Sequence, residues 1–445
     1  MSETWRNMSA SDLGREIGAG RIDPRELTEA FLDAIDAHEF GPRIYARTMP
    51  ERARAEAEAA ANRARDGLRR GLLDGVPISW KDLFDTAGVA TESGSRLLAG
   101  RTPDADAEVL VNATSAGTVA LGKTHMTELA FSGVGLNLAT QTPPNINDPA
   151  LAPGGSSSGA AASVAHGLAA AGIGSDTGGS VRVPSAWNDL VGLKTSSGRL
   201  SNRGVVDLCP RFDTVGPLCR TVEDAAEILA VLEGRRAADL AGADLSGVRL
   251  MVLETLALDA LEDQPAQGFE QAIATLEAAG AVIERRKMPQ VAAAEALSGV
   301  LYSTEAYAVW GETIEGDPGV MYPPTLERFR AGANFSGVEY IRAWRELDRL
   351  REEWLAETAG FDAVIAPTVA IMPPDIARLT ADPEYFKARN MLTLRNTRIG
   401  NLMNSAGLTL PTGVPSTGIM FLAPSGGEER LLRLGTAAEK ALRRG

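Results

Sequence analysis

The chain has 445 residues, of which 44% are hydrophobic and 23% charged, and its formal net charge is −14 at neutral pH. This composition is typical of a globular protein in solution. Because so acidic a surface repels nucleic acid and anionic lipid, we expect neither nucleic acid nor a membrane as a partner.

The first seventy residues predict helices. Asp23 is a typical N-cap before Pro24, and apolar residues follow on one helical face. The stretch 51–70 is rich in Ala, Arg and Glu and has almost no large apolar residue, so it predicts a solvated helix. The first residues include no apolar run, so we expect no secretory signal and a cytoplasmic protein.

Strand and helix patterns then alternate along the chain. Predicted strands cover 76–80, 119–122, 172–175, 190–193, 249–253, 282–285 and 362–366. Predicted helices cover 106–115, 158–170, 264–279 and 338–357. The last of these has an apolar seam of Ile341, Trp344, Leu347, Leu350, Trp354 and Leu355.

This alternation predicts an α/β fold with a single large mixed β-sheet that helices cover on both faces. Length alone would allow two or three domains, but no repeat or long linker interrupts the pattern. We therefore expect one domain over 1–445. Within it we expect an N-terminal helical segment at 1–70, a catalytic core at 71–220 and a substrate-pocket insertion at about 290–345.

Two Gly-Gly-Ser segments are the most unusual feature of the sequence. They place Ser156 and Ser180 at or just before predicted helix starts, where unpaired N–H groups point outward. Three interpretations compete: loops of small capping residues, a phosphate-binding loop, or a serine nucleophile with an oxyanion hole. The phosphate loop would need a Gly-Lys-Ser/Thr ending, which is missing.

A nucleophilic serine needs a base. The three histidines, His38, His125 and His166, are not accompanied by a G-x-S-x-G elbow, which weakens the histidine triad. Lys81 follows the predicted strand 76–80, in the region where α/β sheets place their sites. It remains as a candidate base. The histidines and the two cysteines, Cys209 and Cys219, lack metal-ligand spacing, so we expect no metal and free buried thiols.

Together these segments resemble the amidase signature family. The similarity covers nearly the whole chain, through both Gly-Gly-Ser segments and the shorter motifs at 75–82, 121–124, 192–194, 213–217 and 361–368. The resemblance implies the amidase signature fold and a serine amide hydrolase that uses no cofactor. It implies that Lys81 is the base, Ser156 the bridging serine and Ser180 the nucleophile.

The resemblance also implies the support of this triad. It implies a cis peptide bond between Gly155 and Ser156, and it matches Asp176 and Arg182 to positions that brace the nucleophile loop. The oxyanion hole is expected from four backbone amides, those of Thr177, Gly178, Gly179 and Ser180.

The expected reaction is hydrolysis of a small-molecule carboxylic amide to an acid and ammonia or an amine. Two alternatives stay open: the glutaminase subunit of a tRNA-dependent amidotransferase, and a hydrolase of carbamates or urea derivatives. The small amide is the expected partner, and a homodimer is left open. The substrate pocket is expected to include four residues: Phe131, Tyr302, Tyr307 and Met321.

Several positions depart from the family pattern. Ile146 and Asn147 interrupt the usual Asn-Pro-aromatic run, Ser197 stands where tyrosine is common, and His125 replaces an asparagine. None belongs to the implied triad, so these departures bear on the substrate and not on the chemistry.

Overall fold

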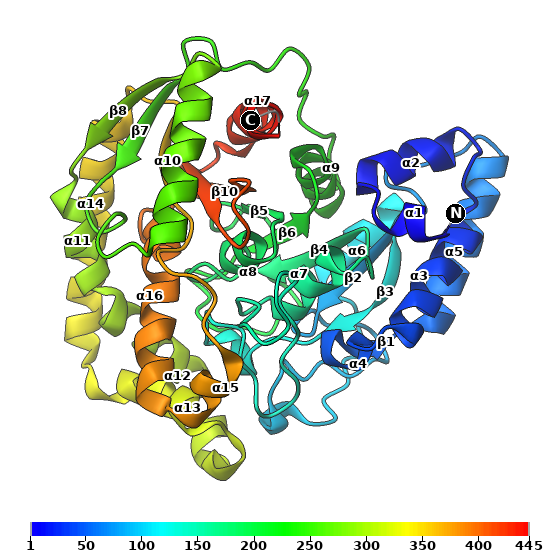
Figure 1. Cartoon of the computed structure of the whole chain (residues 1–445). Coiled ribbons are helices and arrows are strands. Elements are labelled where there is room, and N and C mark those ends of the chain that lie inside the picture. Colours follow the sequence, from blue (N-terminus) through cyan, green and yellow to red (C-terminus); the bar gives the residue numbers. More distant parts are fainter. Residues whose placement is uncertain (1, 444–445) are drawn as a thin grey trace.

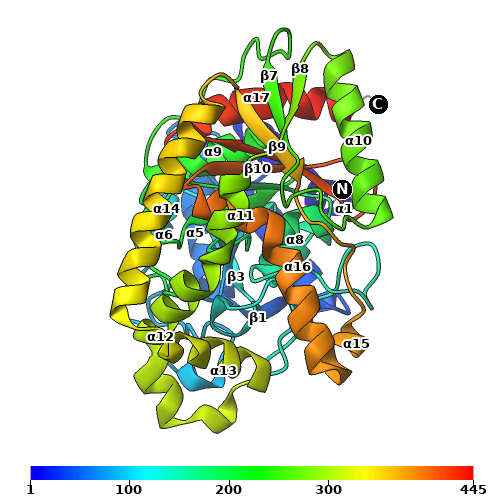
Figure 2. The ribbon, with the colours of Figure 1, turned by 90° about the vertical axis from the view of Figure 1, so that its left-hand side faces the viewer.

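The apolar runs form strands of one sheet in the computed structural model, which describes residues 2–443 (Figures 1 and 2). Along the sheet the order is β1-β3-β2-β4-β6-β5-β10-β11-β9-β7-β8. The strands are β1 Tyr45–Thr48, β2 Pro77–Lys81, β3 Val119–Thr124, β4 Ala171–Ser175, β5 Val191–Lys194, β6 Val215–Cys219, β7 Arg249–Leu253, β8 Val282–Arg286, β9 Ala363–Pro367, β10 Ala406–Pro411 and β11 Gly418–Ala423.

The sheet is mixed. Strands β3, β2 and β4 are parallel to one another, as are β9, β7 and β8. Antiparallel pairs join β4 through β6, β5, β10 and β11 to β9, and β1 is antiparallel to β3. Every residue of β2, β3 and β4 is buried, which is typical of parallel strands covered on both faces. The α/β fold class and the single mixed sheet predicted from the sequence are confirmed.

Helices make up most of the remaining structure. They are α1 Ser2–Arg6, α2 Ala10–Gly18, α3 Pro24–Ala37, α4 Gly41–Ile44, α5 Pro50–Arg65, α6 Glu108–Ala116, α7 Ser158–Ala165, α8 Arg182–Trp187, α9 Val222–Glu233, α10 Asp263–Ala278, α11 Pro289–Ala296, α12 Ser298–Gly316, α13 Pro323–Arg330, α14 Gly337–Thr358, α15 Ile376–Ala381, α16 Pro383–Leu402 and α17 Glu428–Leu442. Short 3-10 turns lie at Arg96–Leu98, Glu128–Ala130, Pro318–Val320 and Ala331–Asn334.

Neighbouring residues of β10 show that helices cover both faces of the sheet. A Cβ at Gly407 would lie 3.2 Å from Arg182 Cδ of α8, whereas Leu408 packs against Gly435 of α17. Because successive strand residues point to opposite faces, α8 and α17 lie on opposite sides. The site described below lies on the α8 side, where α7 also packs against β2 and β4.

The N-terminal segment is not wholly helical, because β1 lies within it. The prediction of a solvated helix over 51–70 was wrong in two respects. Helix α5 ends at Arg65, and its alanines Ala53, Ala57 and Ala60 are buried against α3 and β3. Alanine is small enough to let a charged helix approach the sheet closely, so the lack of large apolar residues did not indicate full exposure.

The seam of α14 also differs from its prediction. Trp344, Leu347, Leu350 and Trp354 are buried, but Ile341 is 60% and Leu355 46% exposed. The sequence did not predict β1, β6, β10 or β11. Strand β6 contains Pro217, which sequence rules count against a strand interior.

Both cysteines are free and buried, as expected. No helix between residues 2 and 443 combines the length and the apolar composition that a membrane crossing requires.

Candidate active site

Lys81 lies at the carboxyl end of β2 and is fully buried. Its Nζ donates to Ser156 Oγ at 2.7 Å and to Ser175 Oγ at 2.8 Å. Ser175 ends β4, the parallel neighbour of β2, so both strands end at the same edge of the sheet. The parallel pairing therefore places a buried amine between two hydroxyl groups.

Burial sets the ionisation of this amine. Loss of hydration lowers the pKa of Lys81 from 10.5 to about 7, against the opposing charges of Asp213 and Asp176. The adjacent Asp82 points elsewhere and pairs with Lys123 Nζ at 3.2 Å. A substantial fraction of Lys81 is thus neutral near pH 7 and can accept a proton.

The bridging position is held by an unusual turn. The peptide bond between Gly155 and Ser156 is cis, as predicted. Gly155 N donates to Gly133 O at 2.7 Å, and a Cβ on Gly155 would lie 2.9 Å from Gly135 Cα. A side chain at residue 155 would therefore collide with backbone atoms.

Ser180 precedes α8 and is nearly buried. Its carbonyl accepts from Ser157 N at 3.3 Å, which ties the nucleophile loop to the segment that carries Ser156. Within residues 2–443 no hydrogen bond joins the hydroxyl groups of Ser156 and Ser180. The structure thus brings the two serine segments together through their backbones.

A buried ion pair braces the loop that carries Ser180. Arg182 donates to Asp176 from Nε at 3.0 Å and from Nη2 at 2.9 Å. Burial alone would raise the pKa of Asp176, but the charge and hydrogen bonds of Arg182 outweigh it and hold that pKa well below its usual range. Arg182 also donates to Thr397 O at 2.7 Å and Asn401 Oδ1 at 2.6 Å, which links the loop to α16.

The backbone amides of the loop divide into two groups. Asp176 accepts from Gly179 N at 2.9 Å, so this amide is occupied, contrary to the expectation that all four point at an oxyanion. The amides of Thr177, Gly178 and Ser180 have no acceptor in the described part of the chain. Gly179 has φ +135°, and a Cβ there would collide with Thr397 Oγ1, which explains the glycine.

Asp213 supports the loop from β6's side and was not predicted as a site residue. Thr177 Oγ1 donates to Asp213 Oδ1 at 2.5 Å, and Leu208 N and Cys209 N donate to its other oxygen. Burial raises the pKa of Asp213 to about 6 despite these donors. The sequence signal that could have identified Asp213 as a site residue is the Asp-Thr-Val-Gly-Pro motif at 213–217.

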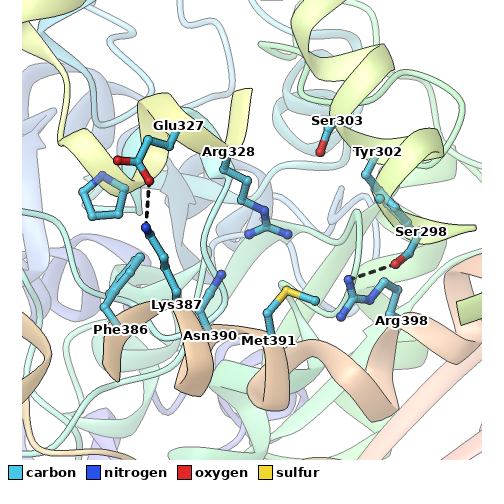
Figure 3. A pocket seen from close by; sticks show the side chains of 12 residues that line it. Ser298, Tyr302, Ser303, Glu327, Arg328, Phe386, Lys387, Asn390, Met391 and Arg398 are labelled. Carbon is cyan, nitrogen blue, oxygen red and sulfur yellow. Dashed lines mark hydrogen bonds and ion pairs between the residues drawn. The ribbon is translucent and has the colours of Figure 1, made fainter. Parts of the chain in front are cut away.

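A cavity opens beside Ser180. It is lined by Ala130, Phe131, Ser132, Thr177, Gly178, Ser180, Leu208, Tyr302, Arg328, Leu394 and Arg398. Two of the predicted pocket residues, Phe131 and Tyr302, are therefore present. Tyr307 and Met321 are not among the lining residues. The sequence did not identify Arg328 or Arg398, which come from α13 and α16 (Figure 3).

The positions that depart from the family pattern lie outside this cavity. Asn147 Nδ2 donates to Asp189 Oδ2 at 2.8 Å and Ser416 Oγ at 3.0 Å, and Ser197 Oγ donates to Arg211 O at 3.3 Å. Ile146 N donates to Asn188 Oδ1. None of these residues lines the cavity, so the expectation that they bear on the substrate receives no support from the lining residues.

The side chains of the three histidines make no hydrogen bond to Ser156 or Ser180 within residues 2–443. The rings of His38 and His166 are 5.4 Å apart in a cluster with Phe40, and His125 is buried beside α4. None of the three lines the cavity. Among residues 2–443 no three His, Cys, Asp or Glu side chains form a group that could hold a metal ion.

Comparison with known proteins identifies the class that this fold and site define. The family described as Amidase matches residues 26–432, and the chain therefore belongs to the amidase signature family of hydrolases that act on C–N bonds. The family resemblance, the fold and the enzyme class predicted from the sequence are confirmed.

Particular relatives span almost the full length. The chain is 32% identical to 2-amino-5-chloromuconic acid deaminase of Comamonas testosteroni, over 98% of each chain. It is 31% identical to a glutamyl-tRNA(Gln) amidotransferase subunit of Anaeromyxobacter dehalogenans, over 96% of each. The solved peptide amidase of Stenotrophomonas maltophilia superposes with a TM-score of 0.82 at 27% identity, covering 98% of this chain and 97% of that one.

Proposed function

We propose that the protein hydrolyses a small-molecule carboxylic amide to an acid and ammonia or an amine, with Ser180, Ser156 and Lys81 as the catalytic residues. The observation that supports this most directly is the buried Lys81 amine, 2.7 Å from Ser156 Oγ, with its pKa lowered to about 7. A lysine in this state can serve as a base at neutral pH.

In the first step, a bond forms between Ser180 Oγ and the amide carbonyl carbon. The Ser180 proton passes to Ser156, whose own proton passes to neutral Lys81. Catalytic hydrogen bonds often tighten only around the substrate, so the Ser156–Ser180 contact is expected to close at this stage. The carbonyl oxygen becomes negative beside the amides of Thr177, Gly178 and Ser180.

In the second step, the C–N bond breaks. Ser156 gives its proton to the leaving nitrogen and takes one back from Lys81, which returns to the neutral form. An acyl ester on Ser180 remains. Water then attacks this ester and gives its proton through Ser156 to Lys81. The bond between the acyl carbon and Ser180 Oγ breaks, the proton returns through Ser156 to Ser180 Oγ, and the acid is released. Loop amides that already point at the oxyanion need no rearrangement, and each such donor is worth roughly 3–4 kcal/mol in a well-studied protease.

A second candidate is supported by similarity. Glutamyl-tRNA(Gln) amidotransferase subunits from several bacteria match this chain at 28–31% identity over nearly the full length. In such a role the chain would release ammonia from glutamine for a partner protein. The relative named a deaminase of 2-amino-5-chloromuconic acid favours a free-standing enzyme on a small acid instead.

The test is ammonia release by the purified full chain, without ATP or partner proteins, from a panel of amides that includes glutamine, one carbamate and one urea derivative. Turnover of a small amide, together with fluorophosphonate labelling of Ser180, supports the proposal. Ser180→Ala should lose both signals, whereas the matched control Ser185→Ala, a buried serine on α8, should keep them. Activity on glutamine alone, and only with added partner proteins, would favour the second candidate.

A further inference from the structure

Two cavities adjoin each other near Ser180. Their non-atom volumes, open solvent included, are about 320 Å³ for the inner one and about 850 Å³ for the outer one. Three residues line both: Tyr302, Arg328 and Arg398. These side chains therefore stand between the outer opening and the nucleophile, where the part of a substrate remote from its amide would lie.

The charged residues that line the inner cavity are all basic. Arg328 and Arg398 are its only charged lining residues, and no carboxylate is among them. Figure 3 shows Arg328 reaching in from α13 and Arg398 from α16. The outer cavity does contain an acid and a further base, Glu327 and Lys387, but these neutralise each other at 2.8 Å. Glu295, which is not a lining residue, pairs with Arg398, so the uncompensated positive charge of the inner wall is that of Arg328.

Arg328 is held in place without a counter-ion. Its Nη1 donates to Phe131 O at 2.8 Å, and its guanidinium carbon lies 4.1 Å from the centre of the Phe131 ring. Within residues 2–443 it has no ion pair. Burial, and after it the charge of Arg398, lower the pKa of Arg328 to about 9, which still leaves it charged at neutral pH.

Arg398 is deeply buried and only partly satisfied. Its Nη2 lies 3.1 Å from Glu295 Oε1, and its Nη1 lies 3.5 Å from Ser298 Oγ. In the described part of the chain neither Nε nor Nη2 makes a hydrogen bond of acceptable geometry, although the side chain is only 5% exposed. Nη2 of the neighbouring Arg395 is likewise unsatisfied. Buried N–H donors without acceptors are costly, and most so on a charged group.

We infer that the substrate carries a carboxylate remote from its scissile amide, and that Arg328 and Arg398 bind this carboxylate. The inference rests on the proposed function of the same site. A carboxylate supplies oxygen acceptors for the unsatisfied N–H groups of Arg398 and a counter-charge for Arg328, and its geometry suits the planar guanidinium forks. The substrate class is therefore a monoamide of a dicarboxylic acid, with the amide directed at Ser180.

The test compares two compounds that differ at one group. Glutaramic acid and its diamide, glutaramide, have nearly the same shape, but only the first carries a charge. Succinamic and adipamic acids, with their diamides, extend the comparison to shorter and longer spacings. The ratio of kcat/KM for acid over diamide, at pH 8 in the native chain, measures the contribution of the carboxylate. We expect at least one of the three ratios to reach roughly 100, which corresponds to about 2.7 kcal/mol.

Variants then assign this preference to the two arginines. Arg328→Gln and Arg398→Gln should each lower the acid-to-diamide ratio at least tenfold. Arg330→Gln on the same helix α13, an exposed arginine paired with Glu315, should leave the ratio unchanged. Binding is measured separately with Ser180→Ala protein. Glutarate should raise its melting temperature, while glutaramide, which has no carboxylate, and inorganic phosphate at equal ionic strength should not.

The outcomes separate the inference from the proposed function. If the native chain hydrolyses the diamides as fast as the acids at every spacing, the carboxylate inference is overturned and amide hydrolysis stands. If stabilisation by phosphate equals that by glutarate, the site binds anions in general and the inference also fails. If Arg398→Gln does not fold, the acid-to-diamide ratios of the native chain and of Arg328→Gln still test the inference. If no amide is hydrolysed and Ser180 is not labelled, the proposed function fails instead.

Discussion

The pH profile tests the ionisation of Lys81 directly. The difference between its ordinary pKa of 10.5 and a value of about 7 corresponds to roughly 5 kcal/mol against the charged form, at about 1.4 kcal/mol per pH unit. Lys81 must be neutral to accept a proton, and the protonated form predominates below this pKa. We therefore expect kcat/KM to rise with pH through about 7 and to be roughly 100-fold lower at pH 5 than on the plateau.

Replacing Asp213 with Asn should move this midpoint in a defined direction. Asp213 has a pKa of about 6, so it is charged around the midpoint, and its charge raises the pKa of Lys81. Without the charge, the protonated lysine is less stable, and the midpoint should fall by about one pH unit, the lower end of effects from a nearby charge. Asp85→Asn, which removes a carboxylate paired with Arg101 in another loop, should leave the midpoint unchanged.

The assay is kcat/KM for ammonia release from pH 5 to 9 at constant ionic strength, alongside the rate of fluorophosphonate labelling of Ser180. Labelling avoids any ionisation of the substrate. Lys81→Met should remove the acidic limb together with most of the rate. A flat profile in the native chain, or a midpoint that moves to higher pH in Asp213→Asn, would refute a neutral lysine base.

Four further outcomes are expected. Ser156→Ala and Lys81→Ala should each reduce kcat by several orders of magnitude, and kinetics of the double variant should show little further loss, because the residues act as a unit; additive losses would contradict this. Gly179→Ala should abolish labelling, since its Cβ has no room and its φ is unfavourable; native-like labelling would contradict the loop geometry. Arg182→Met should cost about 3–5 kcal/mol in urea unfolding by leaving Asp176 uncompensated; a cost below about 1 kcal/mol would show that the pair does not support the fold. Activity should survive dialysis against EDTA, and loss that one metal restores would require a different mechanism.

The two serine segments and Lys81 could be selected from the sequence as candidate site residues because their requirements are local. Two glycines before a serine form a pattern that can be recognised without knowledge of the fold, and Lys81 follows a recognisable apolar strand. The pairing of β2 with β4 then accounts for the Lys81–Ser175 contact. The occupied amide of Gly179 could not be foreseen, because it depends on how the Asp176 carboxylate turns within the loop.

The residues of the cavity wall were harder to predict, because their placement depends on contacts between segments far apart in the sequence. Arg328 and Arg398 are more than a hundred residues from Ser180 and lie on charged helices, where an arginine usually faces solvent. Only the packing of α13 and α16 around the cavity turns them inward. Tyr307 and Met321 line neither of these cavities, since an aromatic or sulfur-containing side chain in this insertion indicates burial but not which cavity it borders.

Helix α16 borders the cavities with one face and supports the Ser180 loop with the adjoining face. Asn390, Met391, Leu394 and Arg398 border the cavities, while Thr397 and Asn401 hold Arg182 behind the nucleophile. A library that randomises the whole helix would change both sets of positions at once. Most of its clones should be inactive, because changes at Thr397 and Asn401 would loosen the loop that Arg182 supports. Randomising only the cavity-facing positions should retain active enzyme while changing its preference. The substrate preference of this protein can thus be changed at one face of α16 while the other face is left intact.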